Sequence, residues 1–117
     1  MRREVFTLLR EAAVIALRGD QKRSFFLGAI GIRKDGAIVA ANNGGSNIPT
    51  PPAHAEARLL RKLGNGAYVY VARVTKGGSL ALAKPCRGCT QGLRNKGVKR
   101  VYYSISDDEF GVMDLNV

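Results

Sequence analysis

The order of helix-like and strand-like segments limits the fold of this chain more than any other feature of its sequence. Apolar residues recur every three or four positions between Arg3 and Leu17, which predicts a helix with one buried stripe. The elements expected after it, in chain order, are two hairpin strands at 24–32 and 37–41, a helix at 53–63, a strand at 68–74, a short apolar segment at 80–83, a helix at 87–96, and strands at 98–105 and 110–115. This order predicts a mixed α/β sheet with helices on its faces.

The hairpin and the loop after it carry clear turn signals. The segment Lys34-Asp35-Gly36 predicts the hairpin turn, since glycine tolerates a positive φ. Both hairpin strands are apolar or small on both faces, so we expect both to be covered on both sides. Thr50 followed by Pro51 and Pro52 predicts the start of the second helix, because a hydroxyl can cap a helix and proline loses no hydrogen bond there.

Length and composition set the class of protein. With 117 residues the chain has room for one core, so we expect a single domain over residues 1–117. No apolar stretch approaches the roughly 20 residues that a membrane span needs, and charges near the N-terminus leave no signal-peptide core. The two cysteines are too few for a secreted disulfide framework. We therefore expect a cytoplasmic protein with no membrane partner.

Positive charge is unevenly placed along the chain. The formal net charge is +10, and between Glu56 and Asp107 there are eleven Lys and Arg residues and no acidic residue. One interpretation is a set of solvated helix faces, with Arg58, Arg61 and Lys62 on the outer side of the second helix. The other is a surface that binds phosphate. The sequence alone leaves both open.

Two cysteines and one histidine form a candidate metal site. Cys86 and Cys89 are three residues apart, so at the start of a helix their sulfurs lie on the same side and can bind one ion. With His54 they give three zinc ligands, and the chain has no other Cys or His. Three ligands favour a catalytic zinc, which leaves a position for water, over a structural zinc with four protein ligands. Taken singly, such a histidine is more often structural, and such a cysteine pair is often a redox pair or incidental.

Glu56 is the residue expected to move protons at this site. Residues two apart on a regular helix point about 200° from each other, so His54 and Glu56 cannot both face one ion from a helix interior. At the first turn of a helix they can, and the Pro51-Pro52 entry supports that placement. Because zinc lowers the pKa of a bound water to about 7, a neighbouring carboxylate would exchange protons there.

Two segments resemble the signature of the zinc-dependent cytidine deaminase superfamily, namely His54-Ala55-Glu56 and Pro85-Cys86-Arg87-Gly88-Cys89. The order of expected elements also fits, so the resemblance covers roughly residues 3–105. It implies a three-layer cytidine deaminase-like fold, with a mixed sheet of four to five strands and helices on both faces. A histidine as first ligand is similar to the deoxycytidylate, tRNA-adenosine and nucleic-acid-editing branches, whereas Arg87-Gly88 departs from the apolar pair common in several branches.

The resemblance implies a role for each matched side chain. His54, Cys86 and Cys89 would bind one zinc per chain. Glu56 would take a proton from water and deliver it to the ring nitrogen of the substrate and to the leaving amine.

The resemblance also implies contacts to the substrate. The backbone of Ala55 and the N–H of Cys86 would hold the base. An asparagine at the end of the second strand would contact sugar or base, and either Asn42 or Asn43 fits. In loops, asparagine more often stabilises turns through its own side chain.

We expect a zinc-dependent hydrolase that deaminates a cytosine-containing nucleotide or nucleoside and releases ammonia, most similar to deoxycytidylate deaminases. An alternative keeps the chemistry but acts on cytosine or adenine in single-stranded DNA or RNA. It ranks second because the chain has few aromatic residues and no tryptophan for base stacking. A third alternative is a binding module in which basic residues hold nucleic acid and Glu56 is idle. We also expect a homo-oligomer.

Overall fold

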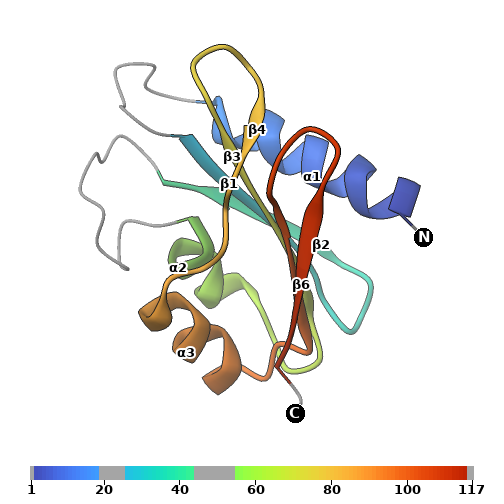
Figure 1. Cartoon of the computed structure of the whole chain (residues 1–117). Coiled ribbons are helices and arrows are strands. Elements are labelled where there is room, and N and C mark those ends of the chain that lie inside the picture. The colour runs from blue at the N-terminus through green and yellow to red at the C-terminus, as the bar shows by residue number, and fades with distance from the viewer. Residues whose placement is uncertain (1, 19–25, 44–54, 116–117) are drawn as a thin grey trace.

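The computed structural model describes residues 2–18, 26–43 and 55–115. Helices cover both faces of one mixed sheet, which confirms the expected three-layer α/β fold (Figure 1). The elements, in chain order, are α1 (Arg2–Ala16), β1 (Phe26–Ile32), β2 (Ile38–Asn42), α2 (Ala55–Leu59), the 3₁₀ turn η2 (Leu60–Lys62), β3 (Tyr68–Val74), β4 (Leu80–Ala81), α3 (Arg87–Asn95), β5 (Arg100–Ser104) and β6 (Phe110–Asp114).

Five strands follow the order β2-β1-β3-β5-β6, and β4 pairs with β3 beside this path. All pairings are antiparallel except β3 with β5, which run parallel. A parallel pair needs a crossover connection, and the segment that contains α3 provides it. The sheet has six strands, more than the four to five expected, because the short apolar segment Leu80–Ala81 pairs with Arg73 and Val74 of β3.

The β1–β2 hairpin turns at Gly36, whose φ of 89° matches the expected left-handed residue. β1 is largely buried, but β2 is not, and the side chain of Ile38 is 64% exposed. The prediction that both strands are covered on both sides is therefore wrong for β2. The reason is topological, because β2 lies at the edge of the sheet and α1 packs mainly over β1 and β3.

Successive residues of β1 face opposite helical layers. Ala29 joins the core that α2 and α3 cover, whereas Ile30 joins the core that α1 covers. Gly28 lies under α1, and a Cβ at this position would collide with the carbonyl oxygen of Ala12 and come within 2.6 Å of the backbone nitrogen of Ala16. The lack of a side chain at Gly28 thus lets α1 lie directly on the sheet.

The second helix is more irregular than the helix predicted for 53–63. It is α-helical over Ala55–Leu59 and tightens into a 3₁₀ turn over Leu60–Lys62, a common form for a helix end. The predicted start at 50–52 lies outside the described residues. α3 agrees with its prediction, and Gly97, with φ of 83°, follows it.

Tyr102 and Tyr103 of β5 pack on opposite faces of the sheet. The Tyr102 ring stacks on Tyr70 with centroids 4.8 Å apart, and Tyr103 packs against the core under α2 and α3. A Cβ at Gly111 would collide with the Tyr103 ring, so β6 depends on glycine there. No helix within the described ranges is long and apolar enough to cross a membrane.

Candidate active site

The start of α3 holds the two cysteines, as the sequence predicts. Cys86 precedes the helix with an extended backbone (φ −69°, ψ 171°), and its Sγ accepts a hydrogen bond from the backbone N–H of Cys89 at 3.5 Å. Thr90 closes the turn, because its N–H and its hydroxyl both donate to the carbonyl oxygen of Cys86 at 2.9 Å. Cys89 is buried and Cys86 is partly exposed. Both thiols therefore lie at one helix start.

Glu56 approaches this start from α2, which packs against α3. Ala55, the residue before it, is fully buried in the core under α2. Glu56 is only 2% exposed, and its carboxyl group lies beside the Cys89 thiol. Among the described residues, Oε1 of Glu56 has no hydrogen-bond partner. A buried, unpaired carboxyl oxygen is costly, and in a native protein it points to a ligand or a catalytic role.

The surroundings shift the ionisation of both groups. Burial raises the pKa of Glu56 to about 7, against smaller lowering effects from a backbone hydrogen bond and from Cys89. Burial, the neighbouring Glu56 carboxyl and Cys86 together raise the pKa of the Cys89 thiol above its ordinary value. A divalent cation on the sulfurs would reverse the shift at Cys89, because it stabilises the thiolate.

The chemistry of these donors fits zinc. Two thiols at one helix start are ligands that zinc accepts, and the carboxyl group of Glu56 lies beside one of them. His54, the third predicted ligand, lies outside the described residues. Within 2–18, 26–43 and 55–115, no three His, Cys, Asp or Glu side chains form a metal-binding group. The three-ligand set therefore stays a prediction.

The two asparagines at the end of β2 differ in their surroundings. Nδ2 of Asn42 donates to the carbonyl oxygens of Ile15 at 3.0 Å and Arg18 at 3.2 Å, which ties β2 to the end of α1. Asn43 is fully buried, and its Oδ1 accepts a hydrogen bond from the N–H of Leu27 at 3.2 Å. Each amide thus has a structural partner, and the contact to substrate stays a prediction for both.

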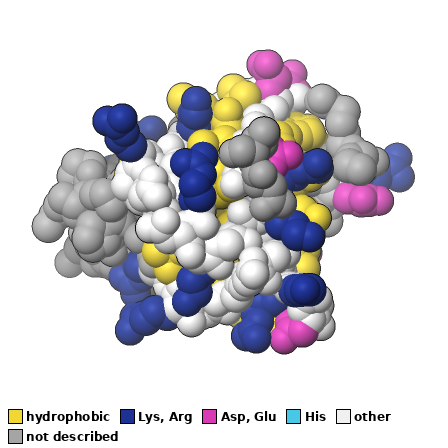
Figure 2. Space-filling view, turned by 90° about the horizontal axis from the view of Figure 1, so that it is seen from below, with side chains coloured by type: hydrophobic (Ala, Val, Ile, Leu, Met, Phe, Trp, Pro, Cys, Tyr) yellow, Lys and Arg dark blue, Asp and Glu magenta, His cyan; other side chains and the backbone are white. Residues whose placement is uncertain are grey.

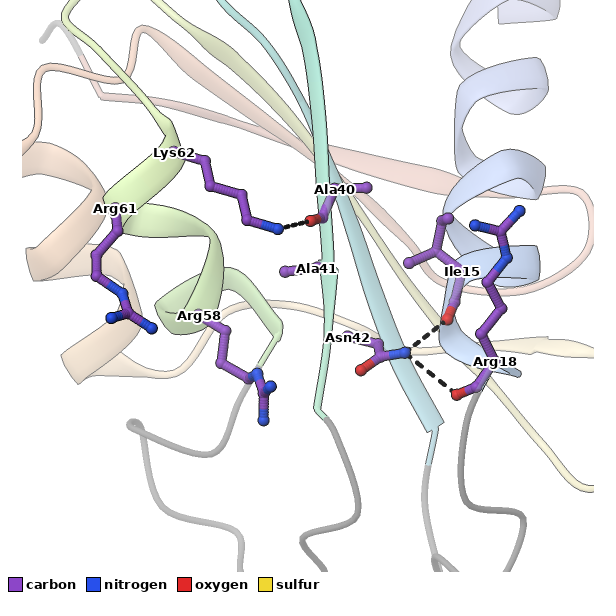
Figure 3. A pocket seen from close by; sticks show the side chains of 8 residues that line it. All are labelled: Ile15, Arg18, Ala40, Ala41, Asn42, Arg58, Arg61 and Lys62. Atoms are coloured by element: carbon purple, nitrogen blue, oxygen red, sulfur yellow. Dashed lines mark hydrogen bonds between the residues drawn. The ribbon is translucent and has the colours of Figure 1, made fainter.

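The sequence did not predict a groove that lies beside β2 (Figure 3). Its volume is about 360 Å³, and four basic side chains line it: Arg18, Arg58, Arg61 and Lys62. The last three lie on the outer side of α2 and η2, where their spacing along the helix places them. Arg18 follows α1, so no local pattern in the sequence could have joined it to the others.

A helix-covered mixed sheet with a buried glutamate against a cysteine pair defines an α/β domain of the zinc deaminase class. The family described as the cytidine and deoxycytidylate deaminase zinc-binding region matches residues 3–105, and the chain belongs to this family. The superfamily resemblance is thereby confirmed, and so is the general expectation of a zinc-dependent deaminase of the cytidine or deoxycytidylate type. No curated protein matches the chain.

Proposed function

We propose that this protein hydrolyses the exocyclic amine of a cytosine-containing nucleotide or nucleoside, as deoxycytidylate deaminases do, and releases ammonia. The observation that carries the proposal is Glu56, a buried carboxyl group with an unpaired oxygen beside the Cys89 thiol. A surface glutamate on a binding module would have no reason to be buried in this way, because burial of a carboxyl without full hydrogen bonding destabilises the fold.

Cys86 and Cys89 would hold the zinc together with His54. When bound, zinc supplies a Lewis acid that makes water a nucleophile at neutral pH. Glu56 would accept a proton from the attacking water and deliver it to the ring nitrogen. It would then take the proton of the added hydroxyl group and deliver it to the amine, so that the C–N bond breaks and ammonia leaves as the new carbonyl forms. Its burial supports this role, because a carboxyl group shielded from solvent exchanges its proton with groups inside the site.

The substrate would be held by groups at the starts of α2 and α3. The backbone of Ala55 and the N–H of Cys86 are the proposed contacts to the base, and Asn42 or Asn43 is the proposed contact to sugar or base. α2, which carries Glu56, packs against both β2 and α3, which supports contacts to one substrate from these elements.

A second candidate function is deamination of cytosine or adenine in a single strand of DNA or RNA. The groove with its four basic side chains favours it, because a strand brings several phosphates to the surface. Figure 2 shows Lys and Arg side chains spread over the face seen from below, with few acidic side chains among them.

A substrate panel tests both candidates. Zinc-loaded protein would be incubated with deoxycytidylate, cytidylate, their nucleosides, and single-stranded oligonucleotides that contain one cytosine or one adenine, and ammonia release would be measured. Turnover of cytosine nucleotides or nucleosides is the expected result, and Glu56→Gln serves as the inactive control. Turnover of oligonucleotides alone would favour the second candidate, and no turnover of any substrate by folded, zinc-loaded protein would contradict both.

A further inference from the structure

The groove beside β2 is built from three elements that are distant in the sequence. The end of α1 forms one wall with Ile15 and Arg18, and α2 with η2 forms the other. Residues Ala40, Ala41 and Asn42 of the edge strand lie between these walls (Figure 3). In the described part of the sheet β2 is the edge strand, so its outer side is open to the groove.

The charge of the groove is strongly positive. Arg18, Arg58, Arg61 and Lys62 line it, and no Asp or Glu is among the lining residues that the structure describes. Within the described part of the chain, none of Arg58, Arg61 and Lys62 has a carboxylate partner, since the ion pairs found there join Arg33 to Asp35 and Arg100 to Asp114. Cations gathered in one hollow repel each other, so the site favours an anion.

Hydrogen bonds fix part of this arrangement. Nζ of Lys62 donates to the carbonyl oxygen of Ala40 at 2.6 Å, and Asn42 is tied to the end of α1. Figure 3 shows the Arg58 and Arg61 side chains extending from α2 and η2 in the direction in which β2 runs from Ala40 to Asn42. Arginine presents a planar fork of donors that matches the oxygens of phosphate. These two residues therefore suit a phosphate ligand.

The groove lies on the outer side of α2, away from Glu56, and has α2 and Asn42 in common with the proposed substrate site. Glu56 is buried on α2, whereas Arg58 on the same helix is exposed and lines the groove. Neither Cys86 nor Cys89 is among the lining residues. A ligand in the groove would therefore contact the outer side of the helix whose inner side carries Glu56.

We propose that this groove is a phosphate-binding site that holds phosphate groups of a nucleotide ligand outside the deaminase centre. The nature of the ligand rests on the proposed function, whereas phosphate binding itself needs no turnover. Two kinds of ligand can supply the phosphate groups: a free nucleotide, through its terminal phosphate, or a single strand, through its consecutive phosphodiesters.

Ligands that contain only thymine separate binding from deamination, because thymine has no exocyclic amine to lose. Fluorescence anisotropy would measure the affinity of the protein for a labelled single-stranded oligothymidylate at several salt concentrations. Competition by thymidylate, thymidine and inorganic phosphate would measure the contribution of a terminal phosphate. The test variant is Arg58→Gln/Arg61→Gln, and the control is Lys76→Gln/Lys99→Gln, which removes the same charge from two exposed positions outside the groove.

The test variant should bind either the oligothymidylate or thymidylate, or both, about tenfold more weakly than wild type. The affinities of the control variant should change little. If the strand is the source, the slope of log affinity against log salt should fall by about 1.4, or about 0.7 for each lost contact. If the free nucleotide is the source, thymidylate should compete less well and thymidine should be unaffected. Unchanged affinity in both arms, or equal losses in test and control variants, would overturn the proposal. Intact phosphate binding without deamination of any substrate would contradict the proposed function alone.

Discussion

The carboxyl group of Glu56 on α2 lies beside the thiol of Cys89 on α3, and both residues are only 2% exposed. This contact joins the two halves of the deaminase signature, which are well separated in the sequence. It exists because α2 and α3 pack side by side on one face of the sheet (Figure 1). Because the two residues have different expected roles, metal binding for Cys89 and proton transfer for Glu56, separate substitutions can test each role.

Substitution of a cysteine should remove the metal. We expect Cys89→Ala or Cys86→Ala to lower zinc affinity by more than about 100-fold, because changes around zinc ligands alone cost about 10- to 100-fold. Elemental analysis of purified protein measures this, with wild type expected to hold one zinc per chain. Loss of zinc should also lower the unfolding temperature, since metal binding contributes to folding. Arg87→Ala, an exposed change between the two cysteines, should keep the metal, and a full zinc content in either cysteine variant would refute the ligand assignment.

Substitution of Glu56 should separate catalysis from metal binding. Glu56→Gln keeps the size of the side chain, so we expect a folded protein that retains zinc and loses turnover by on the order of 10² or more. Steady-state kinetics and zinc analysis of the same preparation give both quantities. Glu109→Gln changes an exposed acid and should leave kcat unaltered. Wild-type turnover by Glu56→Gln would show that this carboxyl does not move protons.

The asparagines at the end of β2 should differ in their effect on stability. Asn43→Ala should lower the free energy of unfolding by about 1–3 kcal/mol, because it removes a fully buried amide and leaves the partly buried N–H of Leu27 without its side-chain acceptor. Asn42→Ala should cost less, since part of its bonding lies at the exposed end of α1. Urea unfolding measures both values. If one of the two asparagines contacts substrate, its replacement by alanine should also lower kcat/KM. Wild-type kcat/KM in both variants would mean that both asparagines have only a structural role.

The close contact of α1 with β1 predicts a cost at Gly28. Gly28→Ala places a Cβ against the backbone of Ala12 and Ala16, so α1 must move outward, and we expect a loss of about 1–3 kcal/mol or more. Gly77→Ala is the matched control, because the nearest atom to its Cβ would be the Thr75 hydroxyl at 3.8 Å. Thermal unfolding of the two variants decides the point, and equal stability would mean that α1 does not need this contact.

Local patterns in the sequence predicted most of the fold. The periodicity of α1, the turn at Gly36 and the apolar strand Tyr68–Val74 each depend on neighbouring residues, so each is readable without a structure. The pair Leu80–Ala81 was predicted as an apolar segment but not as a strand, because two residues form a strand only when a partner offers its edge. The order of strands, which leaves β2 exposed at the edge, likewise depends on packing.

By itself, the sequence determined which groups could perform the chemistry, since it contains one histidine, two cysteines three residues apart and a glutamate in a recognisable setting. Only the tertiary structure decided that Glu56 is buried against Cys89 and that Arg18 joins Arg58 in one groove. The physical reason is that the identity and spacing of residues are local properties. Burial and the gathering of charge arise when distant segments pack on the same face or edge of a sheet.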